Sequence, residues 1–122
     1  MSAMTHVTGV GGYFFRAKDP EALSAWYEQH LEIPPVASAA GPWQTEAGVT
    51  AFTPFPADTD YFGRPEQQAM INLRVRELPA LLQKLREAGA AVDGDMIDSP
   101  YGRFGYVTDP EGNRIELWEP VD

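Results

Sequence analysis

The chain carries one structural pattern twice, and this internal repeat constrains its fold more than any other feature. The stretch GYFFRAKDPEALSAWYEQHLEI begins with alternating residues and continues with apolar side chains at helical spacing. The stretch MINLRVRELPALLQKLREAGA follows the same order, because an alternating strand precedes a helical stripe of leucines. Aligning Arg16 with Arg74 brings the two strands and the two helices into register. The repeat therefore predicts two packed units of similar structure.

The ends of the two halves also correspond. The stretches GVTAFTP and RIELWEP align on their final prolines, which pairs Thr50 with Glu116. Each half is therefore expected to contain a strand, a helix and about three further short strands. We interpret residues 1–122 as a single domain with a first module over about 7–54, a linker over 55–69 and a second module over about 70–120.

Local signals place the helix ends and one hairpin. Asp19-Pro20-Glu21 predicts a helix start, with an acid at the N-cap and proline at the first helical position. Gly89 is the expected stop after the second helix. The turn DPEGN has proline at its second position and a glycine where positive φ is favourable. It is expected to join strands over 101–108 and 113–119 as a hairpin.

The composition describes a globular protein and excludes several classes. Hydrophobic residues make up 43% of the chain and charged residues 22%, as in ordinary packed domains. The formal net charge of -9 disfavours nucleic acid as a partner and leaves a cationic small molecule as a candidate ligand. Without cysteine there is no disulfide and no thiolate metal site. No apolar run suits a membrane span and no signal peptide is recognisable, so we expect a cytoplasmic protein with no membrane partner.

The alternating positions divide the predicted strands into two faces. The apolar sets 13/15/17, 71/73/75 and 115/117 are expected to pack under the helices. The intervening positions then share the opposite face, and aromatic rings beside a few polar groups are typical of a ligand cleft. These positions are Gly12, Phe14, Arg16, Thr50, Phe52, Met70, Asn72, Arg74, Arg114, Glu116 and Trp118.

The duplicated plan, the two helices and the ending DPEGNRIELWEP resemble the vicinal oxygen chelate superfamily. This group comprises glyoxalase I, bleomycin-resistance proteins and extradiol dioxygenases, and the resemblance covers nearly the whole chain. It implies an α+β fold in which two βαβββ modules form a glyoxalase-like half-barrel cleft. It also implies a homodimer, although the sequence leaves open whether the modules pair within one chain or across chains.

The resemblance implies a degenerate metal site. Enzymes of the superfamily usually hold a divalent metal on four inward positions, which correspond here to Gly12, Thr50, Met70 and Glu116. Only Glu116 has a side chain suited to such a metal, because glycine has none and the other two are weak ligands. We therefore expect no metal and no cofactor, and not a standard four-ligand metalloenzyme. A stoichiometric metal in the purified protein, measured by elemental mass spectrometry, would contradict this.

Two roles remain open for Glu116 on sequence grounds. As a buried acid it needs a partner, and Arg16, Arg74 and Arg114 share its predicted face. Without such a partner it becomes a candidate general base. Tyr61 and Phe62 of the linker are similarly open, because they suit either a lid over the cleft or a packed turn.

Two functions of different class fit these residues. The first is a small-molecule binder, similar to the acidic, metal-free bleomycin-resistance proteins that sequester a planar cationic drug. The second is a glyoxalase-like lyase or isomerase that uses Glu116 as its base, so the sequence leaves open whether the protein is an enzyme. Neither reading identifies the ligand. The residues expected to contact it are Phe14, Trp43, Thr50, Phe52, Met70, Asn72, Arg74 and Trp118.

Overall fold

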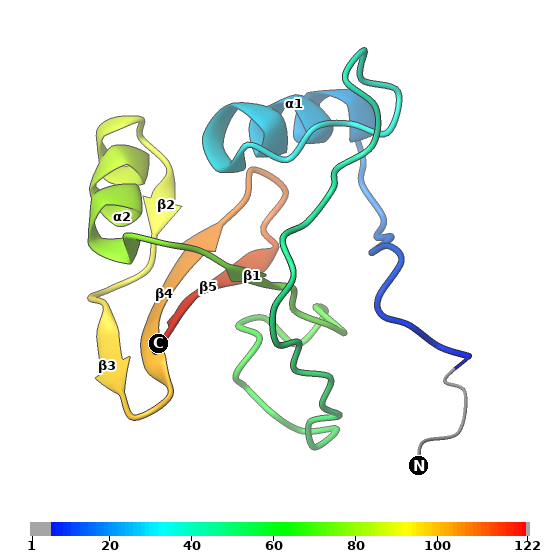
Figure 1. The fold of residues 1–122 in the computed structure, drawn as a ribbon. Coiled ribbons are helices and arrows are strands. Elements are labelled where there is room, and N and C mark those ends of the chain that lie inside the picture. Colours follow the sequence, from blue (N-terminus) through cyan, green and yellow to red (C-terminus); the bar gives the residue numbers. More distant parts are fainter. Residues whose placement is uncertain (1–5, 122) are drawn as a thin grey trace.

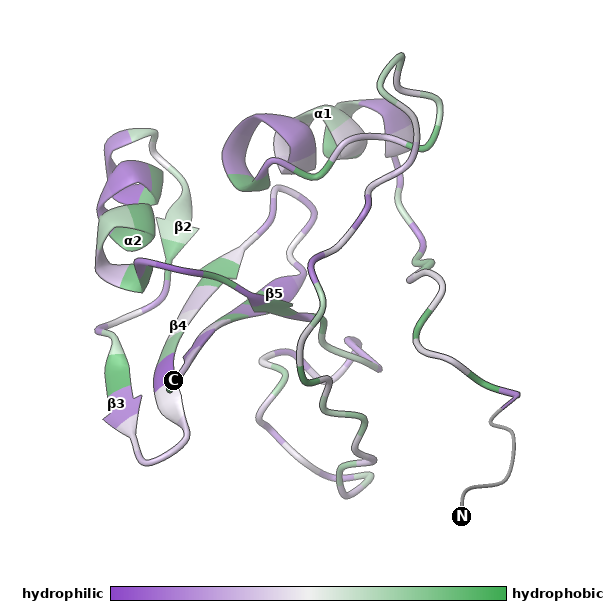
Figure 2. Ribbon diagram, in the orientation of Figure 1, coloured by the Kyte–Doolittle hydropathy of each residue, from purple (hydrophilic) through white to green (hydrophobic). Residues whose placement is uncertain are grey.

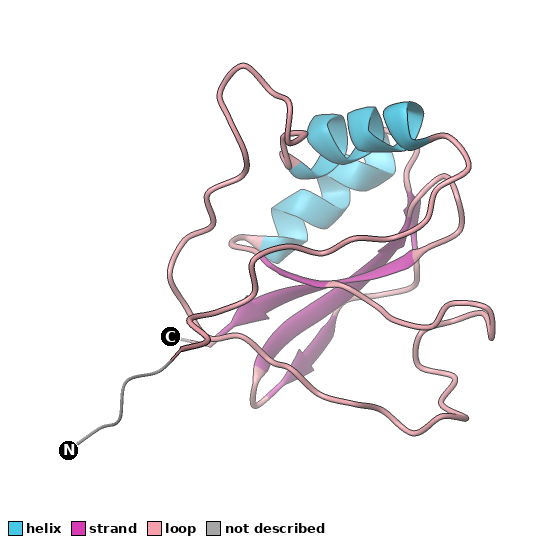
Figure 3. Cartoon of the chain, turned by 90° about the vertical axis from the view of Figure 1, so that its right-hand side faces the viewer, coloured by secondary structure: helices cyan, strands magenta, loops and turns pink. Residues whose placement is uncertain are grey.

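The computed structural model of the 122-residue chain describes residues 6–121, whose fold is shown in Figure 1. A five-stranded sheet carries both helices on one face (Figure 3). In chain order the elements are α1 (Pro20–Leu31), β1 (Asn72–Arg74), α2 (Leu78–Glu87), β2 (Ala91–Val92), β3 (Ile97–Ser99), β4 (Gly102–Thr108) and β5 (Arg114–Pro120). Within the described range, neither helix combines the length and apolar character needed to cross a membrane.

The second half of the chain supplies the whole sheet. The strand order is β1-β5-β4-β2, and β3 also pairs with β4. Strand β1 runs parallel to β5, whereas β4 and β5 form an antiparallel hairpin. This hairpin, expected over 101–108 and 113–119, forms almost at its predicted bounds. The expected order of a strand, a helix and further strands is therefore present in this half.

The first half contains α1 but no strand among its described residues. The stretches expected as strands, 13–17 and 48–54, run as extended connections (Figure 1). Phe14 and Phe52 lie 93% and 90% exposed on them. A strand needs a neighbour for its backbone hydrogen bonds, and the described chain offers these stretches none. The mixed α and β class is confirmed, but two equal βαβββ modules are not seen.

An apolar core joins both helices to the sheet. Leu78 and Leu85 of α2 pack with Ile115 and Leu117 of β5, and all four are at most 1% exposed. Leu23 brings α1 into the same cluster. Burying each such side chain stabilises the fold by about 1.5–3 kcal/mol relative to exposure. The helix-facing positions predicted from the alternation of β1 and β5 are thus confirmed. Figure 2 shows that hydrophobic residues also occur along the strand-free segments of the first half.

The start of α1 is held by two acids. Asp19 accepts a hydrogen bond from the backbone N–H of Ala22 at 3.1 Å, as its predicted N-cap role requires. Glu111, in the turn between β4 and β5, accepts from the backbone N–H groups of Lys18 and Asp19 at 2.6 and 2.9 Å. The positive end of a helix favours negative charge, so these carboxylates stabilise α1 where it meets the hairpin.

The start of α2 uses a different arrangement. Glu77 aligns with Asp19 in the repeat, but it has positive φ and its side chain caps nothing. Glu119, near the end of β5, instead accepts from the N–H groups of Glu77 and Leu78 at 3.2 and 3.1 Å. The C-terminal hairpin therefore provides a capping glutamate to each of the two helices.

Asp109 connects the hairpin to α1. Its carboxylate is 3% exposed and accepts hydrogen bonds from the Tyr27 hydroxyl at 2.7 Å and from the Asn113 amide at 2.8 Å. The backbone N–H groups of Glu111 and Asn113 also donate to it, at 2.9 and 3.0 Å. A buried carboxylate is stable only with such donors. The turn and the helix are thereby fixed to one another.

We predict that Tyr27→Phe lowers the free energy of unfolding by about 1–3 kcal/mol, because it removes a hydrogen bond to a buried charged group. Denaturant-induced unfolding of both proteins measures the difference. Tyr101→Phe is the matched control, because Tyr101 is 74% exposed and a surface change should stay within about 0.5 kcal/mol. Equal effects of the two substitutions would show that Asp109 does not depend on α1.

Candidate functional site

One face of the sheet points away from the helices and gathers polar and aromatic side chains. Tyr106 and Glu116 are direct neighbours across β4 and β5, and Phe104 and Trp118 are the next pair on the same face. Asn72 of β1 pairs with Glu116 from the other side. The strand alternation thus places Glu116 at the centre of this outer face, as the sequence predicts.

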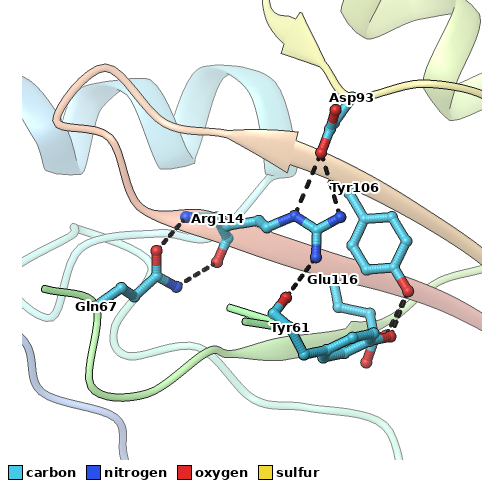
Figure 4. Close-up of polar contacts among 6 residues, drawn as sticks. All are labelled: Tyr61, Gln67, Asp93, Tyr106, Arg114 and Glu116. Atoms are coloured by element: carbon cyan, nitrogen blue, oxygen red, sulfur yellow. Dashed lines mark hydrogen bonds and ion pairs between the residues drawn. The ribbon is translucent and has the colours of Figure 1, made fainter. Parts of the chain in front are cut away.

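Glu116 is buried and hydrogen-bonded by three uncharged groups. It is 8% exposed, and its Oε1 accepts from the Asn72 amide at 2.7 Å. Its Oε2 accepts from the Tyr106 hydroxyl at 2.9 Å and from the Tyr61 hydroxyl. The two tyrosine hydroxyls also lie against one another (Figure 4). Three donors to one carboxylate compensate the loss of water around it.

Two of the three arginines considered as partners of Glu116, Arg74 and Arg114, are engaged elsewhere. Arg74 donates to the backbone carbonyls of Glu46 and Val49 and so holds that segment beside β1. Arg114 forms an ion pair with Asp93. In the described chain, none of the ion pairs joins an arginine to Glu116. The ion pair, one of the two roles left open for Glu116, is thus not seen in the described chain, and hydroxyl and amide donors use its oxygens.

Arg114 and Gln67 fix the linker against the sheet. The Gln67 amide accepts from the backbone N–H of Arg114 at 2.8 Å and donates to its carbonyl at 2.9 Å, as a neighbouring strand would. The Arg114 guanidinium donates to the Tyr61 carbonyl at 2.6 Å and lies 4.0 Å from the centre of the Tyr106 ring (Figure 4). Of the two readings of the linker, the structure favours a packed turn.

A hollow borders this cluster. Its volume is about 350 Å³, and it lies between the linker, the segment around β3 and the strands β4 and β5. Beside it, the rings of Phe104 and Trp118 are parallel within 8°, with centroids 6.1 Å apart. The indole N–H of Trp118 donates to the Tyr101 carbonyl at 3.0 Å, which fixes the ring. The residues that line the hollow are Asp60, Tyr61, Gly63, Asp93, Ile97, Tyr106 and Arg114.

Comparison with known proteins identifies the family. Residues 13–118 match the model of the glyoxalase-like domain. The chain belongs to this family. The predicted resemblance to the vicinal oxygen chelate superfamily is thereby confirmed. None of the curated proteins matches the chain in sequence.

Solved structures agree with this glyoxalase-like assignment. TnmS3, an antibiotic binding protein from Streptomyces sp. CB03234, is 25% identical with a TM-score of 0.65, over 97% of this chain and 100% of its own. A glyoxalase/bleomycin resistance protein/dioxygenase superfamily member from Sphaerobacter thermophilus is 19% identical, with a TM-score of 0.58 over 93% and 98% of the two chains. TioX from Micromonospora sp. ML1 is 17% identical, with a TM-score of 0.52 over 86% and 93%. The last two are alike in fold only.

The structure gathers only some of the predicted ligand residues. Asn72 touches Glu116, while Arg74 and Trp118 are register partners on the same face. Three predicted ligand aromatics of the first half take part in none of the ring contacts of the described chain. They are Phe14, Trp43 and Phe52, exposed by 93%, 46% and 90%. Thr50 is exposed and Met70 is half-buried. A ligand role for all eight predicted residues stays a prediction.

Tyr61, Tyr106 and Phe104 complete the site, and none of them was among the residues expected to bind ligand. Tyr106 and Phe104 could have been found from the sequence, because they alternate along the strand that pairs with β5. No such signal identified Tyr61, because a linker lacks the regular alternation from which the direction of a strand's side chains is predicted.

The family's usual metal does not fit this donor set. In residues 6–121, no three His, Asp or Glu side chains gather in a group able to hold a metal ion. Both oxygens of Glu116 are used by hydroxyl and amide donors, which a metal ion would have to displace. That the protein is metal-free stays a prediction, but the chemistry of the site gives it support.

Both tyrosines at Glu116 are held in their protonated form. Burial raises the pKa of Tyr61, and its hydrogen bonds to Glu116 and Tyr106 raise it further. Burial also raises the pKa of Tyr106 and the bond to Glu116 adds to it, whereas the Tyr61 bond and the Arg114 charge act in the opposite direction. At neutral pH both hydroxyls therefore act as donors to the carboxylate.

We predict that stability falls at alkaline pH. The pKa values of Tyr61 and Tyr106 exceed their ordinary 10.0 in the folded state, so the unfolded chain loses these protons first as the pH rises. Their contribution is complete below pH 10.0 and declines above it. Denaturant unfolding at about pH 8 and about pH 11 measures the decline. Glu116→Gln removes the negative charge and should reduce it. An unchanged decline in that variant would contradict the proposed coupling.

Proposed function

We propose that this protein binds a small planar molecule on the outer face of its sheet, without the metal centre of its enzymatic relatives. The observation that carries the proposal is the parallel pair Phe104 and Trp118 beside a buried carboxylate and a hollow of about 350 Å³. Parallel rings offer stacking area for a flat ligand, while the Asn72 amide, which uses one N–H on Glu116, offers further polar groups that fix its orientation. A hollow of this size suits a molecule of several rings.

The similarity to TnmS3 supports the same class of function. That protein is described as antibiotic binding, and the match extends over the full length of both chains. Family membership alone does not separate binders from enzymes, because one fold serves many functions. The local chemistry of Glu116 therefore carries more weight than the family.

A lyase or isomerase with Glu116 as general base has less support. A base needs an oxygen free to accept a proton from its substrate. Here the Oε2 atom accepts from two tyrosine hydroxyls and the Oε1 atom accepts from Asn72. A substrate would have to displace at least one of these donors before proton transfer.

We further propose that the protein forms a homodimer. Val10, Phe14, Val49 and Phe52 lie at least 65% exposed on extended segments that lack strand partners in the described chain. Unpaired strand-forming segments with apolar side chains favour association, and a second copy offers matching segments. Light scattering measures the mass in solution. A monomer at all concentrations would exclude the dimer.

The binding proposal is tested with a panel of polycyclic aromatic compounds and the change in tryptophan fluorescence. We predict that Trp118→Leu weakens binding of any hit by about tenfold, because a stacked aromatic contact contributes about 0.5–1.5 kcal/mol beyond the area that it buries. Trp26→Leu is the matched control, since Trp26 belongs to α1 on the helix side of the sheet. Equal losses in both variants, or no hit in the panel, would reject the proposal.

A further inference from the structure

The place that the Tyr61 side chain occupies provides partners for both the ring and the hydroxyl of a phenol. Its ring stacks on Phe55, with centroids 5.5 Å apart and planes within 16° of parallel. It meets the Tyr106 ring edge-on at 6.0 Å, and its hydroxyl donates to the buried oxygen of Glu116. An aromatic surface, an aromatic edge and a charged acceptor therefore surround this one ring.

The parts of this place differ in how firmly the fold holds them. Glu116, Tyr106 and Asn72 belong to three adjacent strands and keep their positions through the sheet register. Tyr61 comes from the linker, which contributes no strand to the sheet. Without Tyr61, the Oε2 atom of Glu116 would keep a single donor, the Tyr106 hydroxyl. A buried carboxylate that loses a donor favours any group that restores it.

A neutral donor satisfies the carboxylate at this place, as the Tyr61 hydroxyl shows. The Arg114 guanidinium lies 5.7 Å from the centre of the Tyr61 ring and 4.0 Å from that of Tyr106. A cationic ligand in the position of Tyr61 would meet this like charge as well as the carboxylate of Glu116. A hydroxyl on an aromatic ring donates a hydrogen bond without bringing a charge. Further rings of such a ligand have room in the adjoining hollow, which Tyr61 itself lines.

We propose that the ligand is a neutral, planar hydroxyaromatic compound whose hydroxyl replaces that of Tyr61 on Glu116, so that Tyr61 fills the site until the ligand displaces it. This inference rests on the proposed small-molecule binding function and names the chemical class of the ligand. It replaces the planar cationic drug suggested by the net charge of the whole chain. Tyr61 thus competes with the ligand for Glu116. The site distinguishes hydroxyaromatic compounds from other planar compounds by this hydrogen bond, in addition to the stacking that both can make.

The test removes the internal phenol and supplies it from solution. Tyr61→Gly opens the place, and p-cresol, which has the structure of the missing side chain, is added at increasing concentration. We expect p-cresol to raise the Tm of this variant by about 3–6 °C at saturating concentrations. Toluene has the same shape without the hydroxyl and should give a much smaller shift. If the variant is unfolded alone, p-cresol but not toluene should restore its circular dichroism on refolding.

Two matched variants identify the partner of the hydroxyl. Tyr101→Gly removes an exposed tyrosine and should respond to p-cresol no more than the wild-type protein does. The double variant Tyr61→Gly/Glu116→Leu lacks the acceptor and should no longer distinguish p-cresol from toluene. In the wild-type protein, 2-naphthol should bind about tenfold or more tightly than naphthalene, because only the former can donate to Glu116.

The possible results separate this inference from the broader proposal. No response of Tyr61→Gly to p-cresol, or an equal response to toluene, would overturn the phenol site. Binding of other compounds that depends on Trp118 would still support the small-molecule function in that case. Rescue by p-cresol without any binding to the wild-type protein would show instead that Tyr61 is a permanent part of the fold, and would overturn its displacement by ligand.

Discussion

The hydrogen bond between Tyr27 and Asp109 joins the first half of this protein to the C-terminal hairpin, and the position of α1 on the sheet depends on it. Asp109 fixes the turn of the C-terminal hairpin through Asn113 and the backbone, while Tyr27 brings α1 to the same carboxylate. With α1 in place, Glu111 reaches its N-terminus. The hairpin then presents Glu116 on the opposite face of the sheet. One buried acid thus supports the helix layer, and the sheet positions a second acid for the site.

Sequence reasoning was most successful where the chain is periodic. The alternation of β1 and β5 correctly separated the core positions 73, 115 and 117 from the outer positions of Asn72, Glu116 and Trp118. The start of α1 was predictable for a different reason, because a capping residue acts through local chemistry that does not depend on the rest of the fold. The role of Glu119 at α2 was not, since it reaches the helix from a distant strand.

The remainder of the site depends on tertiary contacts that the periodicity of strands and helices does not predict. Arg74 lies on the predicted face, but its guanidinium turns to the carbonyls of Glu46 and Val49 and not to Glu116. Tyr61 reaches Glu116 only because Gln67 and Arg114 dock the linker. The missing strands of the first half have a comparable cause, because their formation requires a neighbouring strand that the described chain does not provide.

The buried charge of Glu116 is compensated by neutral hydrogen-bond donors. A carboxylate at this position in a metal-binding relative would be compensated by a cation. Here Tyr61, Tyr106 and Asn72 supply neutral donors that satisfy both oxygens. These hydrogen bonds compensate the burial of the Glu116 carboxylate without adding a charge. A group that replaces one of the donors must therefore carry a proton, as a hydroxyl does. In the proposed function, this arrangement favours a ligand that donates a neutral hydrogen bond.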